Sequence, residues 1–213
     1  MGKMKHSVKR LGVLGGSFDP VHMAHLLVAE TVREALSLDL VLFVPTGVQP
    51  LKQGRPVAPA EHRLKMLELA LRDNPCFDIS RVDVDREGPS YTVDTVRQLR
   101  EEWGGETLQM WFIVGADSLA SFPRWLDPAG ILSQVRLAVV RRPGVSVDTA
   151  VMEQQLPGVA ASLDWVDAPL MAISATGIRQ RVAAGRSIRY RVPDAVREYI
   201  EAHDLYRGVT NNG

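Results

Sequence analysis

Apolar residues along the chain form short continuous runs separated by longer periodic segments. Continuous apolarity over the length of a strand predicts a strand that is covered on both faces of a sheet. Such runs occupy residues 11–14, 40–44, 108–114 and 137–140, and a last strand is expected at 165–173. Residues 77–84 alternate apolar and polar positions instead, which predicts an exposed or edge strand.

The segments between the strands carry apolar residues every three or four positions, the spacing of a helix with one buried face. This spacing predicts helices at 26–36, 60–72, 92–103, 148–156 and 174–184, a final helix from Pro193, and short helices at 119–125 and from Pro128. Strands that alternate with helices favour an α/β fold, Rossmann-like and doubly wound, with a mainly parallel sheet and helices on both faces. We expect residues 1–213 to form one domain, with mobile tails at about 1–8 and 208–213.

Composition narrows the class of protein. Hydrophobic residues make up 46% of the 213 positions and charged residues 23%, values of an ordinary globular protein, so disordered and fibrous classes are excluded. The 25 Lys and Arg residues balance the 25 Asp and Glu residues, which argues against a general nucleic-acid binder. A local basic pocket for a small phosphate ligand is still compatible with this balance.

The single cysteine, Cys76, excludes a disulfide framework and a cysteine metal cluster, and it favours a reducing compartment. No apolar run is long enough for a membrane span, and the first apolar run is too short for a signal peptide. We therefore expect a cytoplasmic protein that binds neither membrane nor nucleic acid.

Residues 12–25, GVLGGSFDPVHMAH, predict a strand, a tight turn and the start of a helix. At the end of the first strand of a parallel sheet, backbone amides and a helix N-terminus converge on an anionic ligand. Gly15 and Gly16 do not match the GxGxxG pattern and no GK[ST] follows, so the dinucleotide fingerprint and the Walker A loop are both absent. The two glycines could also serve only to permit the turn.

His22 and His25 lie three positions apart, so on a helix that begins near Pro20 they share one face of the first turn. Three interpretations are open. The pair could chelate a metal, although no local carboxylate offers a third ligand. Both could be ordinary surface or core histidines. The third interpretation, which we favour, is that they donate hydrogen bonds to the negative charge that develops during phosphoryl or nucleotidyl transfer.

A second candidate phosphate site lies near the end of the chain. Ser174 and Thr176 bring hydroxyl groups to a predicted helix start, and Arg179 lies three residues beyond Thr176 on the same face. Taken alone, this pattern is also compatible with an ordinary N-cap followed by a solvated arginine.

Five segments together resemble the HxGH nucleotidyltransferase superfamily, and within it the bacterial nicotinate-nucleotide adenylyltransferases. The first and last are shared with relatives such as pantetheine-phosphate adenylyltransferase, whereas the third and fourth narrow the match to the nicotinate enzymes. The segments are GGSFDPVHMAH at 15–25, VPTGVQPLK at 44–52, GPSYTVDT at 88–95, GADSLASFPRW at 115–125 and ISATGIR at 173–179.

The resemblance implies transfer of AMP from ATP, with Mg²⁺, to nicotinate mononucleotide, which yields deamido-NAD and pyrophosphate in NAD synthesis. It implies catalytic roles for His22, His25 and Arg179. No metal ligands are implied, because the ATP phosphates would mainly hold the Mg²⁺. Binding of ATP and its phosphates is implied for Gly15, Gly16, Ser17, Phe18, Lys52, Ser174 and Thr176, and binding of the mononucleotide for Thr92, Asp117 and Trp125. A homo-oligomer is compatible with the sequence.

The chemistry agrees with the residue types. The attacking group would be a phosphate that is already anionic, so neither a nucleophilic side chain nor a strong base is required. Alternative explanations remain for single residues: Trp125 could be a core tryptophan, Asp117 a helix cap, and Lys52 a solvated loop residue.

Three positions depart from the family pattern. Ala24 stands where HxGH has glycine, and Leu51 and Leu126 stand where many relatives carry histidine and tyrosine. The last two bear on the ATP-side loop and on the pyridine pocket. The alternatives are therefore the same transfer to nicotinamide mononucleotide or phosphopantetheine, and a non-catalytic nucleotide-binding regulator. A regulator would be marked by loss of His22, His25 or Arg179, all of which are present.

Overall fold

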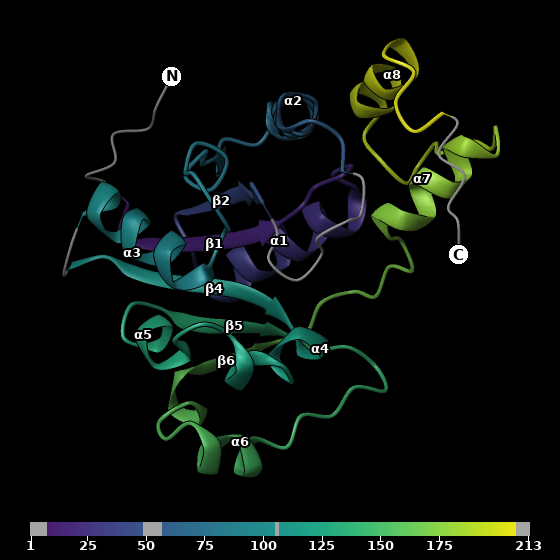
Figure 1. Cartoon of the computed structure of the whole chain (residues 1–213). Coiled ribbons are helices and arrows are strands. Elements are labelled where there is room, and N and C mark those ends of the chain that lie inside the picture. Colours follow the sequence, from purple (N-terminus) through teal and green to yellow (C-terminus); the bar gives the residue numbers. More distant parts are fainter. Residues whose placement is uncertain (1–7, 49–56, 105–106, 208–213) are drawn as a thin grey trace.

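The computed structural model describes residues 8–48, 57–104 and 107–207, and its centre is a six-stranded, all-parallel sheet with strand order β3-β2-β1-β4-β5-β6 (Figure 1). The chain runs outward from β1 to one edge, returns to β4 and continues to the other edge. The strands are β1 (Arg10–Gly16), β2 (Leu40–Pro45), β3 (Phe77–Ile79), β4 (Gln109–Gly115), β5 (Arg136–Val140) and β6 (Leu163–Val166). The expected doubly wound α/β fold is confirmed.

Helices cover both faces of this sheet. The α-helices are α1 (Met23–Ala35), α2 (Ala60–Leu71), α3 (Thr92–Trp103), α4 (Ala116–Leu119), α5 (Pro128–Leu132), α6 (Thr149–Gln155), α7 (Ala175–Ala183) and α8 (Asp194–Ala202), and the 3₁₀ turns are η4 (Phe122–Arg124) and η5 (Ala160–Ser162). Buried residues of α3, α5 and α6 form one core cluster, and those of α1, α2, α7 and α8 form another. In Figure 1, α7 and α8 lie on the side of the sheet toward which the arrow of β1 points, its carboxyl end.

Strand β2 shows why a parallel sheet needs continuous apolar runs. Its alternate residues Leu40, Leu42 and Val44 belong to the first core cluster, whereas Val41 and Phe43 belong to the second. Both faces of the strand are therefore removed from water, and every position favours an apolar side chain.

Several predicted boundaries are wrong. The strand expected at 165–173 is β6, which ends at Val166, and residues 167–174 are irregular because Pro169 cannot donate to a ladder and Leu170 is 65% exposed. Of 77–84, only β3 pairs with the sheet, and residues 81–85 form a turn closed by hydrogen bonds to the Arg81 carbonyl. The short helix expected at 119–125 is divided into α4 and η4.

Gly15 and Gly16 lie in a strand and not in the predicted turn. Gly15 and Gly16 are the last two residues of β1, paired with Val44 and Pro45 of β2, and the turn follows them. Helix α1 begins at Met23 with His22 as its N-cap, rather than near Pro20. The two histidines are therefore held at the very start of the helix.

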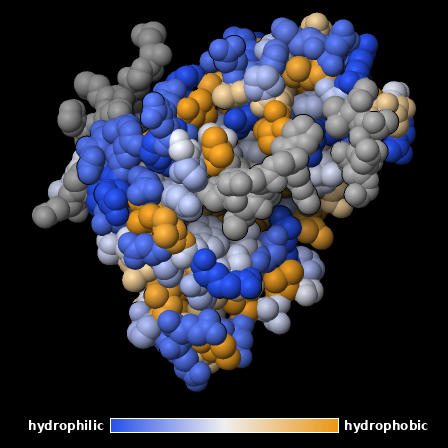
Figure 2. Space-filling view, in the orientation of Figure 1, coloured by the Kyte–Doolittle hydropathy of each residue, from blue (hydrophilic) through white to orange (hydrophobic). Residues whose placement is uncertain are grey.

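None of the helices in the described ranges has the length and apolarity that crossing a membrane requires. The expected mobile tails, apart from Val8, lie outside the described residues, as do Leu51 and Lys52. Figure 2 shows apolar residues scattered among polar ones over one face of the molecule.

Candidate active site

A cleft of about 640 Å³ opens at the carboxyl ends of β1, β4 and β5. One wall is the turn after β1 and the start of α1, and the opposite wall is the irregular segment 168–174 with the start of α7. Six of the residues selected from the sequence lie in these walls: Ser17, His22, His25, Ser174, Thr176 and Arg179. The fold thus brings together two motifs that are about 150 residues apart, both of which the family resemblance assigned to ATP binding.

Gly15 and Gly16 make room for aromatic rings. A Cβ atom at Gly15 would meet the ring of Phe112 at 3.3 Å, and one at Gly16 would meet the ring of Phe18 at 3.2 Å. Phe18 is buried, has a backbone φ of 48° and packs edge-on against the ring of His25 at a centroid distance of 5.0 Å. The glycines therefore make room for Phe18 and Phe112 to pack behind the residues of the cleft wall. Phe18 is not itself part of that wall.

His22 and His25 stack, with ring centroids 3.6 Å apart and planes 15° apart. The backbone N–H of His22 donates to Nδ1 of His25 at 3.3 Å. Since this hydrogen bond makes Nδ1 of His25 an acceptor, the ring proton of neutral His25 resides on Nε2, where it is available to a ligand.

Burial keeps both rings neutral. It lowers the pKa of His22 to about 4 and that of His25 to about 3, and the positive charge that His22 would carry lowers the pKa of His25 further. Within the described residues the buried Nδ1 of His22 has no hydrogen-bond partner.

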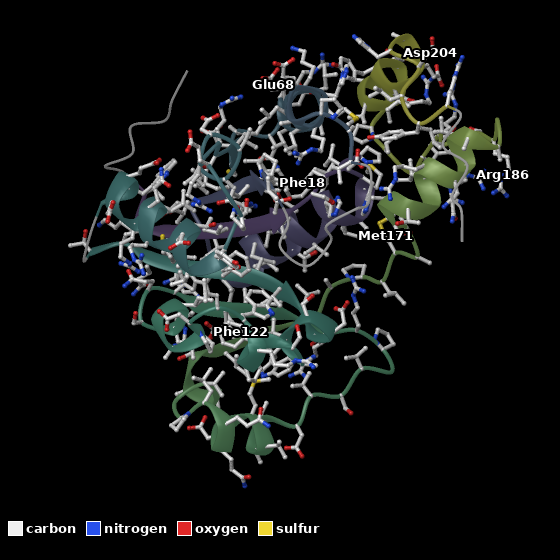
Figure 3. The ribbon with its side chains drawn as sticks, in the orientation of Figure 1. Phe18, Glu68, Phe122, Met171, Arg186 and Asp204 are labelled. Atoms are coloured by element: carbon white, nitrogen blue, oxygen red, sulfur yellow. The ribbon has the colours of Figure 1, made fainter. Side chains whose placement is uncertain are left out.

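Helix α7 presents Arg179 to the same cleft. Nη1 of Arg179 donates to the backbone carbonyl of Asp19 at 2.7 Å, and Nη2 donates to Oγ1 of Thr176 at 3.4 Å. Ser174 caps the helix, because its Oγ accepts from the N–H of Gly177 at 3.1 Å. Figure 3 shows Met171, another residue of the cleft wall, on the approach to this helix. The start of α7 therefore combines a positive helix end with a guanidinium group.

Sequence reasoning missed two buried charged residues beneath the turn. Asp19 is 2% exposed and Arg63 is 4% exposed. Nη1 of Arg63 donates at 2.9 Å to the carbonyls of both Ser17 and Thr46, and its Nε donates to the carbonyl of Ala58 at 3.0 Å. The available signal was that Arg63 stands beside Leu64 on the apolar face of the predicted helix.

Arg141 and Arg142 were also missed, although they directly follow strand β5 and line the cleft. The guanidinium of Arg141 lies 4.5 Å from the ring centroid of Trp165. Nη1 of Arg142 lies 3.4 Å from Oδ2 of Asp117. Two consecutive arginines after a buried strand were the signal that could have found them.

The predicted mononucleotide residues lie beside the cleft rather than in its wall. Thr92 is the first residue of α3, and Asp117 is exposed in α4. Trp125 packs edge-on against Phe112 at a centroid distance of 6.1 Å, and its Nε1 donates to Oγ of Ser121 at 3.2 Å. The ring of Phe112 also faces Gly15, so Trp125 packs against a ring that lies at the carboxyl end of β1.

Two of the departures from the family pattern have a place in the structure. Ala24 lines the cleft, so its methyl group takes space that a glycine would leave open. Leu126 is 52% exposed, next to Trp125.

A doubly wound parallel sheet with paired histidines and an arginine at its strand ends has the features of a nucleotide-binding transferase. Residues 13–181 match the cytidylyltransferase-like family model, so the chain is a nucleotidyltransferase of this class.

Curated relatives define the particular family. The chain is 50% identical over 197 residues to a probable nicotinate-nucleotide adenylyltransferase from Roseiflexus sp. strain RS-1, covering 92% of this chain and 98% of the relative. It is 48% identical over 202 residues to one from Thermomicrobium roseum, covering 95% and 94%. The chain therefore belongs to the nicotinate-nucleotide adenylyltransferases, enzymes of NAD biosynthesis.

A solved structure shares the fold. Plasmodium falciparum nicotinic acid mononucleotide adenylyltransferase complexed with NaAD superimposes with a TM-score of 0.73 at 17% identity, covering 93% of this chain and 97% of that one. At this identity the likeness concerns the fold alone.

Proposed function

We propose that this chain transfers the adenylyl group of ATP to the phosphate of nicotinate mononucleotide, forming deamido-NAD and pyrophosphate. The observation that carries the assignment of the site is the convergence of His22, His25 and Arg179 on one cleft at the strand ends. Membership of the nicotinate-nucleotide adenylyltransferases supports the choice of substrates.

In the proposed reaction a phosphate oxygen of the mononucleotide attacks the α-phosphorus of ATP. One P–O bond forms, the bond to the β-phosphate oxygen breaks, and pyrophosphate leaves with the electron pair. The attacking oxygen is already anionic at neutral pH, so the protein's task is to position the two phosphates and to stabilise the negative charge. The absence of a nucleophile–base pair from the proposed machinery is consistent with this chemistry.

His25 and Arg179 are the proposed charge stabilisers. Nε2–H of His25 is free to donate, because Nδ1 is occupied by the backbone of His22. A neutral imidazole that does not titrate near pH 7 donates over the whole physiological range. Arg179 would bind the triphosphate together with Ser174, Thr176 and the first amides of α7. Ser17 would contact the ATP on the other wall, and Gly15 and Gly16 would form the strand end behind it.

The acceptor would lie on the side of Asp117, Thr92 and Trp125. Asp117 is oriented by its ion pair with Arg142, and this arrangement suits hydrogen bonds to a ribose. Trp125 offers a ring for stacking on a pyridine, and Thr92 offers a hydroxyl near the start of α3. Lys52, the remaining proposed phosphate ligand, lies outside the described residues.

Mg²⁺ would enter with ATP and would be held mainly by the phosphates. Among the described residues no group of three histidine, cysteine or acidic side chains could hold a metal ion. The carboxylates at the cleft already have partners: Asp19 accepts from Tyr206, and Asp117 pairs with Arg142. This donor set suits an ion that keeps its waters and binds substrate phosphates. As an ATP-dependent step, the reaction would take place in the cytoplasm.

Turnover on three acceptors tests the proposed substrate. The enzyme is supplied with ATP and Mg²⁺, and with nicotinate mononucleotide, nicotinamide mononucleotide or phosphopantetheine, while pyrophosphate release is measured. The highest kcat/KM is expected with nicotinate mononucleotide, with deamido-NAD as the product. A preference for phosphopantetheine, or equal use of both mononucleotides, would contradict the proposal.

A further inference from the structure

The C-terminal part of the chain touches the turn between β1 and α1 at two points. The backbone N–H of Met23, one residue after His22, donates to the carbonyl of Arg191 at 2.9 Å. The hydroxyl of Tyr206 donates to Oδ1 of Asp19 at 2.7 Å, a contact between residues 187 positions apart. Figure 1 shows α8, which precedes Tyr206, packed beside α2 and close to α7, and Figure 3 labels Asp204 at the end of this segment.

Asp19 is buried and contacts both this segment and Arg179. Its Oδ1 also accepts from the N–H of Ala58 at 3.3 Å, and its Oδ2 lies 3.7 Å from Nη1 of Arg179. The same Nη1 donates to the backbone carbonyl of Asp19. Both the charge and the backbone of Asp19 therefore fix where the guanidinium lies, and anything that shifts Asp19 shifts Arg179.

Tyr206 is suited to hold Asp19 in place. Its side chain is 8% exposed and belongs to the core cluster on the α1 and α2 face of the sheet. Burial and the neighbouring Asp19 carboxylate raise the pKa of the phenol, so its hydroxyl stays protonated and donates. A buried carboxylate that loses such a donor must move toward its other partners or toward water.

We propose that Tyr206 is a positioning residue for the transfer reaction, holding Asp19 and through it the guanidinium of Arg179 in the cleft. The inference rests on the proposed role of Arg179 in binding the triphosphate. It makes the C-terminal segment part of the ATP side of the site, although no atom of Tyr206 lines the cleft.

The test compares Tyr206→Phe with Tyr199→Phe in the full-length protein. Phenylalanine keeps the ring in the core and removes only the hydroxyl. Tyr199 is a matched control, because it lies on α8 and its hydroxyl bonds to Nδ1 of His62 at 2.9 Å, away from Asp19. ATP affinity is measured by calorimetry, and KM for ATP and for nicotinate mononucleotide by steady-state kinetics.

Tyr206→Phe is expected to weaken ATP binding and raise KM for ATP by roughly three- to tenfold, with KM for the mononucleotide unchanged. Tyr199→Phe should alter neither value. A purely structural role would instead lower the active fraction, and so kcat, at constant KM. ATP affinity and KM within twofold of the wild type in Tyr206→Phe would overturn the inference.

A second comparison tests the route through Arg179. In an Arg179→Ala background, Tyr206→Phe should have no further effect on ATP affinity, because the group that it positions is gone. An equal loss in both backgrounds would overturn the inference. ATP binding is measured without the acceptor, so failure of wild-type turnover on nicotinate mononucleotide would refute the proposed function and leave this binding comparison decisive on its own.

Discussion

The hydrogen bonding and protonation of the side chains at the cleft depend on the backbone that follows the strand ends. His22 caps α1 and its backbone orients the ring of His25, so one residue fixes the tautomer of the other. Burial then keeps both imidazoles neutral, which suits hydrogen-bond donation to phosphate at any pH near 7.

Arg179→Lys tests the planar guanidinium. A lysine keeps the charge, but its donors all sit on one nitrogen, whereas Arg179 reaches Asp19 and Thr176 from two separate nitrogens. We expect KM for ATP to rise by about ten- to a hundredfold, measured by pyrophosphate release. Arg181→Lys is the control on the same helix, because the side chain of Arg181 donates only to the carbonyl of Ser187 among the hydrogen bonds described. Equal effects of the two substitutions would contradict the role of Arg179.

The neutral histidines also predict how stability depends on pH. The pKa of His22 is lowered from 6.5 to about 4, so between these values the unfolded chain binds more protons than the folded one. Stability is therefore fully present above about pH 6.5 and is lost as pH falls toward 4. Chemical unfolding at pH 7, 6 and 5 should show this decline, and His22→Gln should make it shallower. The same slope in the variant would refute the buried neutral ring.

Whether a residue of the site could be predicted from the sequence depends on how far along the chain its partners lie. His22, His25, Ser174 and Arg179 stand in local patterns that select them as candidates, and the structure places all four at the cleft. The role of Asp19 depends on Arg179 and on Tyr206, which lie 160 and 187 positions away. The spacing of residues within one helix or strand cannot predict such contacts. The buried polar contacts of Asp19, Arg63 and Tyr206 were therefore seen only in the structure.

At the scale of elements, Arg63 of α2 joins three loops. It satisfies carbonyls of the turn after β1, of the end of β2 and of the chain entering α2. Burying an arginine costs desolvation free energy, which lowers its pKa, and three hydrogen bonds from Nε and Nη1 to carbonyl oxygens offset part of this cost.

Arg63→Met should lower the free energy of unfolding by about 3 kcal/mol, because it leaves buried carbonyls without a donor. Arg81→Met is the control, since Arg81 forms an exposed ion pair with Asp85, and its loss should leave stability nearly unchanged. Denaturant unfolding of both variants measures the difference. A loss below about 1 kcal/mol in Arg63→Met would show that the three loops are held by other contacts.

The elements themselves were predictable where burial is two-sided. Strands β2, β4 and β5 follow from continuous apolar runs, because both of their faces are covered. Strand β6 was misplaced for a physical reason: its apolar residues continue into segment 168–174, where they line the cleft instead of the sheet. Apolarity alone does not distinguish a cleft wall from a strand.

At the scale of the whole molecule, the sheet order brings the first strand to the centre and the last helices back to its carboxyl end. The glycine-rich turn and the start of α7 thereby become opposite walls of one cleft. The family resemblance implied that both motifs bind ATP, whereas the contacts between the C-terminal segment and the turn could be seen only in the three-dimensional structure.

The most direct test of this account is the turnover of His25→Ala with ATP, Mg²⁺ and nicotinate mononucleotide. Loss of a preorganised donor at the transferring phosphate should lower kcat by about 100- to 1000-fold, with little change in unfolding midpoint. His62→Ala, on α2 outside the cleft wall, should retain wild-type kcat. A His25→Ala enzyme with near-normal kcat would contradict the assignment of this cleft as the site of adenylyl transfer.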